Sequence, residues 1–145
     1  MSRSLIAFAS IIAASLIATA SGYPNAFAAE KKEAYVSPGS DRKPLFSGPV
    51  HGMESHEITI EQFTFPPGWV GGKHYHTGPV FVYILDGEFS VSEQGRQDQK
   101  FTSGTLYREP IGTPMRARNL SASRPLKVLL IQLGGKGEPL MIKAD

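Results

Sequence analysis

Residues 72–89 read GKHYHTGPVFVYILDGEF and hold two of the four histidines of the 145-residue chain. His74 and His76 are separated by one residue, and a nearly unbroken apolar run, residues 80–85, follows them. Side chains two residues apart on a strand point to the same face, so both imidazoles can converge on one cation. The run ends at Asp86-Gly87, a dipeptide that is typical of a hairpin turn. The stretch therefore predicts a strand with a pair of metal ligands in front of it.

The chain around this stretch has the spacing of glycine and proline that is typical of an all-β domain. In EITIEQFTF, residues 57–65, the apolar alternation changes phase between Ile60 and Phe63, which predicts a strand with a bulge. Short strands separated by Gly and Pro every 8–12 residues indicate a sandwich or barrel. We predict further strands over residues 79–86, 88–93, 98–102, 105–109, 114–119 and 126–133.

Two motifs in this region resemble those of the cupins, small β-barrels of the jelly-roll type. The first family motif is G-x5-H-x-H-x3-4-E-x6-G, and the second is G-x5-P-x-G-x2-H-x3-N. The chain matches them, with the family's internal spacing, at Gly68, His74, His76, Gly87, Gly104, Pro110, Gly112 and Asn119. The resemblance covers about residues 57–133 and implies an all-β fold, a cupin-type jelly-roll barrel or double-stranded β-helix.

The chain departs from the family at two of the residues that complete the metal shell. In the cupins, three histidines and one glutamate hold the metal. The glutamate position of the first motif falls on Val80, and the histidine position of the second motif falls on Met115. His74 and His76 alone would hold a metal weakly, so further ligands must come from elsewhere.

Three sources of further ligands remain open. Met115 offers a thioether, which would suit Cu(I) better than Fe(II) or Mn(II), although methionine also fills gaps in cores. Glu109 offers a carboxylate on the strand before Pro110, unless it faces solvent. His51 and His56 could contribute if the N-terminal segment folds back over the barrel mouth, but they suit exposed positions as well. The predicted metal site is therefore His74, His76, Met115 and Glu109, for a divalent or copper ion whose identity the sequence leaves open.

Residues 1–28 have the features of a secretory signal peptide. Arg3 precedes an apolar stretch, residues 5–20, and Ala26-Phe27-Ala28 forms a cleavage pattern. The stretch is shorter than the roughly 20 residues that a membrane-spanning helix needs. No cysteine follows it, which excludes a lipoprotein anchor. We expect the mature protein to begin near Ala29 and to be periplasmic or secreted.

The remaining chain is predicted to comprise an irregular N-terminal arm, residues 29–56, and a barrel, residues 57–145. After removal of Arg3 it carries 14 basic and 13 acidic residues. This balance predicts neither a nucleic-acid partner nor, after signal removal, a membrane partner. The chain has no cysteine, so the fold depends on its core. The apolar run over residues 80–85 needs cover, and we expect a homodimer that pairs through edge strands.

Three classes of function remain, because a fold does not determine an activity. The favoured one is an exported module that binds a metal, a small molecule or both through His74 and His76. The alternatives are a metal-dependent cupin enzyme of the dioxygenase or isomerase type, and a structural or regulatory dimer without a ligand. The residues assign no catalytic side chain, so enzymatic activity stays open.

Overall fold

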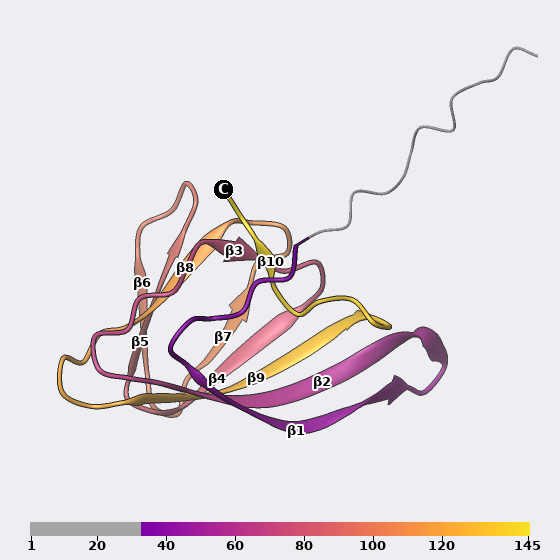
Figure 1. Cartoon of the computed structure of the whole chain (residues 1–145), viewed down its shortest axis with the longest axis horizontal. Helices are drawn as coiled ribbons and strands as arrows, with labels where there is room; N and C mark the ends of the chain where they lie inside the picture. The colour runs from indigo at the N-terminus through magenta and orange to yellow at the C-terminus, as the bar shows by residue number, and fades with distance from the viewer. Residues whose placement is uncertain (1–32) are drawn as a thin grey trace, which may run out of the picture. The chain divides into compact units, whose positions relative to one another are not determined.

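The computed structural model describes residues 33–145 as two antiparallel five-stranded sheets (Figure 1). The first sheet has the order β1-β2-β9-β4-β7, and the second has the order β10-β3-β8-β5-β6. The strands are β1 (Asp41–Val50), β2 (Met53–Phe65), β3 (His74–Tyr75), β4 (Val80–Asp86), β5 (Glu88–Glu93), β6 (Gln99–Thr102), β7 (Leu106–Glu109), β8 (Met115–Asn119), β9 (Leu126–Gly135) and β10 (Ile142–Lys143). Over residues 33–145 there is no helix, and hence none able to cross a membrane. The predicted signal peptide and its cleavage site lie outside this range.

The all-β prediction is confirmed, and the six strands predicted beyond residue 78 correspond to β4 to β9. A turn does occur at Asp86-Gly87, but the prediction of a hairpin there is wrong, because the turn joins β4 of the first sheet to β5 of the second and these strands do not pair with each other. Gly87 has a φ of 97°, and a Cβ there would lie 3.1 Å from backbone atoms of Pro125 and Leu126. Glycine therefore meets two requirements at once, a left-handed backbone and a close approach to the start of β9.

The structure corrects the expectation of an irregular arm up to residue 56. Residues 41–50 form β1, which pairs with β2, so only residues 33–40 precede the sheet as a mainly irregular segment. The prolines and glycines that suggested a loop are compatible with β1 because it is an edge strand. Pro44 and Pro49 have no backbone N–H to donate, and an edge strand tolerates this loss.

The structure also corrects the predicted bulge in residues 57–65. β2 pairs with β9 without interruption from His56 to Phe65, and the register shift lies in β1 between Pro44 and Phe46. The phase change arises because both faces of β2 carry apolar residues. Phe63 and Phe65 point into the core together with Glu61, while Ile58 and Ile60 lie on the outer face.

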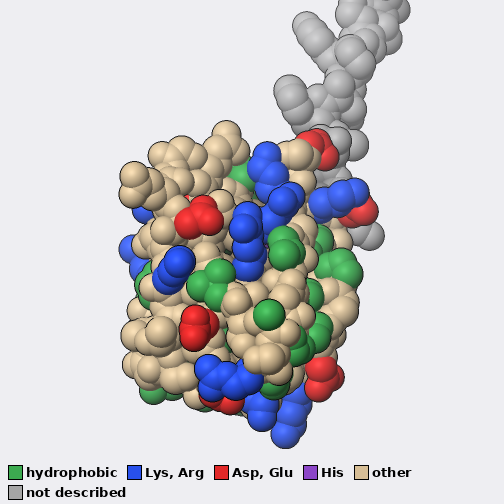
Figure 2. Space-filling model, turned by 90° about the vertical axis from the view of Figure 1, so that its left-hand side faces the viewer, with side chains coloured by type: hydrophobic (Ala, Val, Ile, Leu, Met, Phe, Trp, Pro, Cys, Tyr) green, Lys and Arg blue, Asp and Glu red, His purple; other side chains and the backbone are tan. Residues whose placement is uncertain are grey.

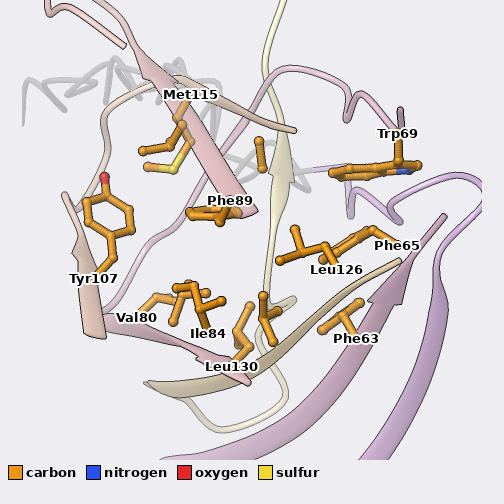
Figure 3. Packing of buried hydrophobic residues seen from close by; sticks show 14 of the residues in the cluster. Phe63, Phe65, Trp69, Val80, Ile84, Phe89, Tyr107, Met115, Leu126 and Leu130 are labelled. Carbon is orange, nitrogen blue, oxygen red and sulfur yellow. The ribbon is translucent and has the colours of Figure 1, made fainter. Parts of the chain in front are cut away.

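The core fills the space between the inner faces of the two sheets (Figure 3). Burial of each large apolar side chain contributes about 1.5–3 kcal/mol to folding, and no disulfide supplements it. The buried members of the core are Phe63, Phe65, Trp69, Val80, Val82, Ile84, Phe89, Val91, Tyr107, Met115, Ala117, Leu126, Val128, Leu130 and Met141.

Candidate metal centre

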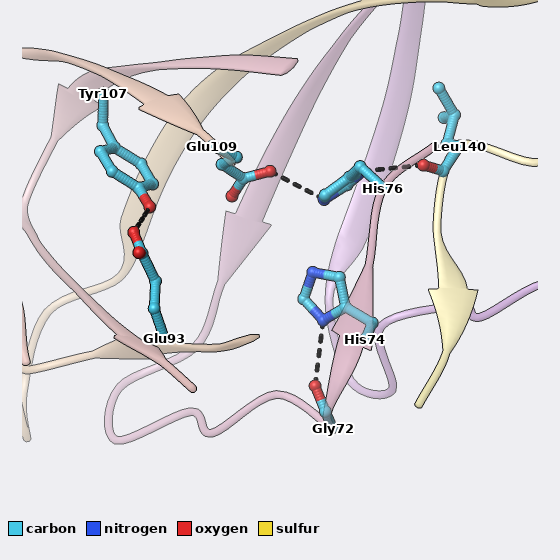
Figure 4. A network of polar contacts seen from close by, with 7 residues as sticks. All are labelled: Gly72, His74, His76, Glu93, Tyr107, Glu109 and Leu140. Carbon is cyan, nitrogen blue, oxygen red and sulfur yellow. Dashed lines mark hydrogen bonds and ion pairs between the residues drawn. The ribbon is translucent and has the colours of Figure 1, made fainter. Parts of the chain in front are cut away.

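His74 begins β3 of the second sheet, and His76 follows directly after that strand, so the two side chains lie side by side (Figure 4). Their side chains are 4% and 1% exposed, and the ring centroids are 5.2 Å apart with the planes nearly perpendicular. Both line a cavity of about 30 Å³ inside the barrel, together with Glu109 and mostly apolar residues. A water needs roughly 10–15 Å³ by this measure, so the space suits an ion or a water rather than an organic substrate.

The backbone holds both imidazoles in the same tautomer. Nδ1 of His74 lies 3.0 Å from the carbonyl oxygen of Gly72, and Nδ1 of His76 lies 2.8 Å from that of Leu140. A carbonyl oxygen only accepts hydrogen bonds, so each Nδ1 carries a proton and donates it. Each neutral ring then keeps its lone pair on Nε2. Histidines that ligate metals are oriented by this kind of hydrogen bond from the other ring nitrogen.

Glu109, at the end of β7, contacts His76 directly. Its Oε2 lies 2.7 Å from Nε2 of His76, and its side chain is buried, so the solvent-facing alternative is wrong. Burial lowers the pKa of His76, but the hydrogen bond and charge of Glu109 outweigh this effect and raise the pKa above its usual value. Burial lowers the pKa of His74, which the Gly72 carbonyl and Glu109 only partly oppose. His74 is therefore the neutral ring, and His76 is the ring that shares a proton with Glu109.

A row of three residues explains how a carboxylate reaches this cavity without a glutamate in the first motif. Val80 of β4 pairs with Glu109 of β7 on one side and with Gln132 of β9 on the other. All three are buried. The position where the cupins carry glutamate is thus occupied by Val80, and Glu109 stands directly opposite it on the neighbouring strand.

Sequence reasoning missed Gln132. This residue interrupts the apolar run of β9 at a position that faces the core, and that polar interruption was the available signal. Its Oε1 is buried without a hydrogen-bond partner. A buried carbonyl oxygen without a donor marks a place that favours a proton or a cation.

Met115 pairs with His74 across β3 and β8, but it belongs to the core. It is 1% exposed, and Figure 3 shows it on the side of the core that holds Phe89 and Tyr107. Met115 is not among the residues that line the histidine cavity. The thioether of Met115 therefore fills space and gives no reason to expect Cu(I), and the methionine that lines the cavity is Met141.

An N-terminal segment does fold over the site, but it brings other residues than the predicted histidines. The ring of Tyr35 stacks on His74 with centroids 5.1 Å apart, and its hydroxyl accepts a 2.6 Å hydrogen bond from the Gly72 N–H. Ser37 lines the cavity. His51 is exposed in the turn between β1 and β2, and the ring of His56 bonds to its neighbour Ser55.

A second buried carboxylate has both of its oxygens occupied by hydrogen bonds from neighbouring side chains. Glu93 of β5 accepts a hydrogen bond from Tyr107 (Figure 4) and two more from Gln99 and Arg96. Burial and the Glu93 carboxylate strongly raise the pKa of Tyr107, which keeps its hydroxyl protonated. This network ties β5 to β7 and leaves no free oxygen for a ligand in the cavity.

The donor types at the cavity fit a metal ion, although the side chains are not preset around one point. No group of three or more His, Cys, Asp or Glu residues within 33–145 is arranged to hold an ion as it stands. His76 and Glu109 contact each other instead. Apart from this contact, Nε2 of His76 and Oε2 of Glu109 have no hydrogen-bond partner. A cation that replaced the shared proton would satisfy both atoms.

Comparisons with known proteins agree with this architecture. The family model described as a cupin domain matches residues 61–132. No match was found among curated proteins. Three solved structures show the same fold at low identity. A cupin 2 domain-containing protein from Halorhodospira halophila is 20% identical, with a TM-score of 0.59 over 74% of this chain and 71% of its own.

The other two structures come from an archaeon and a bacterium. A cupin with a double-stranded β-helix fold from Methanocaldococcus jannaschii is 19% identical, with a TM-score of 0.54 over 64% of this chain and 78% of its own. The DMSP lyase DddQ from Ruegeria pomeroyi is also 19% identical, with a TM-score of 0.54 over 70% of this chain and 52% of its own. The motifs, the two opposed sheets and the family match together show that the chain belongs to the cupin superfamily.

Proposed function

We propose that this cupin is a metal-binding protein whose ligands are His74, His76 and Glu109. The observation that carries the proposal is the shared tautomer of the two imidazoles beside a buried carboxylate. Both rings donate from Nδ1 to backbone carbonyls, so both Nε2 atoms are the ones left to bind a metal at one cavity, that of His74 without a partner side chain and that of His76 once a metal replaces the proton it shares with Glu109. This set of metal ligands differs from the one predicted from the sequence, because it leaves out Met115.

This donor set favours a divalent first-row metal over Cu(I). Two imidazoles and one carboxylate with open positions form the set that non-haem Fe(II) proteins use, and imidazole also suits zinc. Met115, whose sulfur was the reason to expect Cu(I), lies outside the cavity lining, and the methionine that does line the cavity is Met141. When bound, such an ion would act as a Lewis acid toward a small oxygen-containing ligand.

A metal-dependent enzyme is the second candidate, favoured by a larger hollow next to the cavity. This hollow of about 470 Å³ is lined by residues 34–37, by parts of β1 and β2, and by residues 138–141. It shares Ser37, Phe63 and Met141 with the histidine cavity. A small molecule bound there would be separated from the histidines only by these side chains and the Tyr35 segment.

The metal proposal is tested by titrating untagged full-length protein with Fe(II) or Zn(II) under anaerobic conditions. We expect stoichiometric binding by the wild type and at least a tenfold loss of affinity in His74→Ala, about 1.4 kcal/mol or more. Exposed His51 gives the matched control, His51→Ala, which should bind as tightly as the wild type. Equal affinity in wild type and His74→Ala would end the metal proposal.

We also propose export to the periplasm or the medium, supported by the signal-peptide features of residues 1–28. Mass spectrometry of protein from its native host should find a chain that begins near Ala29. A main species that retains Met1 would contradict export by this route.

A homodimer is proposed as the assembly, through the outer face of the first sheet. Cross-strand pairing aligns apolar residues there into rows, one of which runs through Phe46, Ile60, Ile131 and Phe81. Other apolar side chains on this face are Ile58, Tyr83, Leu85, Leu106, Leu129 and Leu133. Phe46 is 52% exposed and Leu106 is 58% exposed. Contiguous apolar patches of this kind mark interaction sites on soluble proteins.

A second copy of the chain is the partner that this face fits best. A two-fold interface presents the same patch on both subunits, and an apolar centre without carboxylates can meet itself without like-charge repulsion. The prediction of pairing through edge strands is revised here. β1 carries Pro44, Pro49 and two register shifts, all of which disfavour the addition of another strand at that edge.

A further inference from the structure

The outer face of the second sheet carries a concentration of positive charge. On β8, Arg116 and Arg118 alternate with inward-facing residues, so both side chains lie on the outer face. Figure 2 views the side of the molecule that carries β5 and β6 and shows several Lys and Arg side chains gathered there. The near-balance of total charge gave no sign of this local excess.

Part of this face is hollowed into a groove of about 350 Å³. Its lining includes three cations, Lys73, Arg116 and Arg118, and one carboxylate, Glu93. Both oxygens of Glu93 already accept hydrogen bonds from Tyr107, Gln99 and Arg96. The groove therefore has an excess of positive charge that its one carboxylate does not neutralise.

The three cations lack acidic side-chain partners in the part of the chain that the structure describes. None of them forms an ion pair with an Asp or Glu side chain of residues 33–145. Lys73 donates a hydrogen bond to the main-chain oxygen of Asp145, the last residue that the structure describes. Nε of Arg118 is buried and has no acceptor. Because the structure gives this guanidinium nitrogen no acceptor, the charge of Arg118 adds to the positive potential of the groove that it lines.

We propose that this groove binds a small oxyanion of the phosphate or sulfate class, held by Arg116, Arg118 and Lys73. The planar fork of a guanidinium matches two oxygens of such an anion, and the ammonium of a lysine adds a point charge. This site is separate from the metal proposal, because its three cations are not among the residues that line the histidine cavity.

The test is a calorimetric titration of the full chain with inorganic phosphate and with sulfate. We expect saturable binding with a Kd in the millimolar range or below. Arg118→Gln and Arg116→Gln should each weaken it at least tenfold, and raised salt should weaken it further through screening. Arg108→Gln is the matched control, an exposed arginine on the outer face of the other sheet, and should change the affinity less than twofold.

Circular dichroism should show that each variant retains the β spectrum of the wild type. Vesicles of phosphatidylglycerol, compared with phosphatidylcholine, distinguish a lipid headgroup from a free anion. Phosphate binding that both arginine variants lose supports the site, and additional vesicle binding lost in the same variants identifies headgroups as a source. No saturable phosphate or sulfate binding up to about 10 mM, or equal binding by Arg108→Gln and Arg118→Gln, would overturn it.

Discussion

The two sheets of the barrel share a core but have unlike outer faces. The first sheet is apolar outside, where Ile131 and Phe81 lie in one cross-strand row. The second sheet carries arginine and serine outside, as in the pairing of Arg116 with Ser92. The sequence patterns of the strands account for this difference. β4 and β9 are nearly continuous apolar runs, whereas β5 and β8 alternate. Alternation is typical of a sheet with one solvated face, and continuous runs are typical of strands covered on both faces.

The strongest way to break this comparison is to place a charge in the middle of the apolar face. We expect Ile131→Glu to turn the dimer into a monomer, because each subunit would have to bury an unpaired carboxylate against the other. The dimer Kd should rise by at least a hundredfold, about 2.7 kcal/mol or more. Sedimentation equilibrium measures this change.

A charge on the other face provides the control for this prediction. Ser92→Glu lies at an outward position of β5, on the second sheet, and should leave the dimer intact. If the wild type sediments as a monomer at high concentration, the outer face of the first sheet is not a dimer interface, and the proposed difference between the two faces is wrong.

The histidine cavity lies between the two sheets. Variants of residues near it test whether Glu109, a carboxylate on β7, replaces the glutamate missing from the first motif. Glu109→Gln keeps the size of the side chain but removes its charge, and we expect metal affinity to fall at least tenfold. Met115→Leu should bind metal as the wild type does, since Met115 belongs to the core rather than to the cavity. Loss of binding in Met115→Leu but not in Glu109→Gln would reverse this assignment.

Two turns offer a matched pair of glycines, Gly87 between the two sheets and Gly95 between β5 and β6 of the second sheet. Gly87→Ala places a Cβ 3.1 Å from backbone at Pro125 and Leu126 in a left-handed conformation, and should cost about 2–3 kcal/mol of folding free energy. Gly95→Ala is also left-handed, with a φ of 81°, but no atom lies within 4 Å, so about 1 kcal/mol is expected. Urea unfolding measures both values, and equal losses would refute the close approach of β9.

The smallest expected effect is a pH dependence of the metal-free protein. The raised pKa of His76 means that the folded state binds its proton more tightly than the unfolded state. This contribution to stability is complete below the usual histidine pKa and is lost as the pH rises through the folded value. His74, with its lowered pKa, acts in the opposite sense and costs stability as the pH falls below the usual value.

His76→Gln separates these two contributions. The variant should lose the decline in stability at higher pH and keep the decline at lower pH that His74 causes. Thermal unfolding of both proteins between about pH 5 and 9 measures the profiles. Parallel profiles would show that His76 and Glu109 do not share a proton.

Local pattern in the sequence was enough for the strands and for the first two ligands. The periods of residues 79–86 and 126–133, the glycines between strands and the two motifs predicted an all-β barrel with His74 and His76 in front of an apolar strand. These features depend on neighbours in the chain, since alternation and turn preference act over a few residues. The same local reading was wrong for residues 41–50, because proline and glycine occur both in loops and on edge strands.

Only the tertiary structure decided what completes the site. Glu109 reaches His76 because β7 pairs with β4 in a register that sets Glu109 opposite Val80, and Gln132 arrives from β9 by the same row. Tyr35 covers His74 from a segment 39 residues earlier in the chain. The outward position of Ile60 likewise depends on how β2 pairs with β9. Strand register and sheet order come from contacts between distant residues, and a one-residue slip would send every side chain of a strand to the other face.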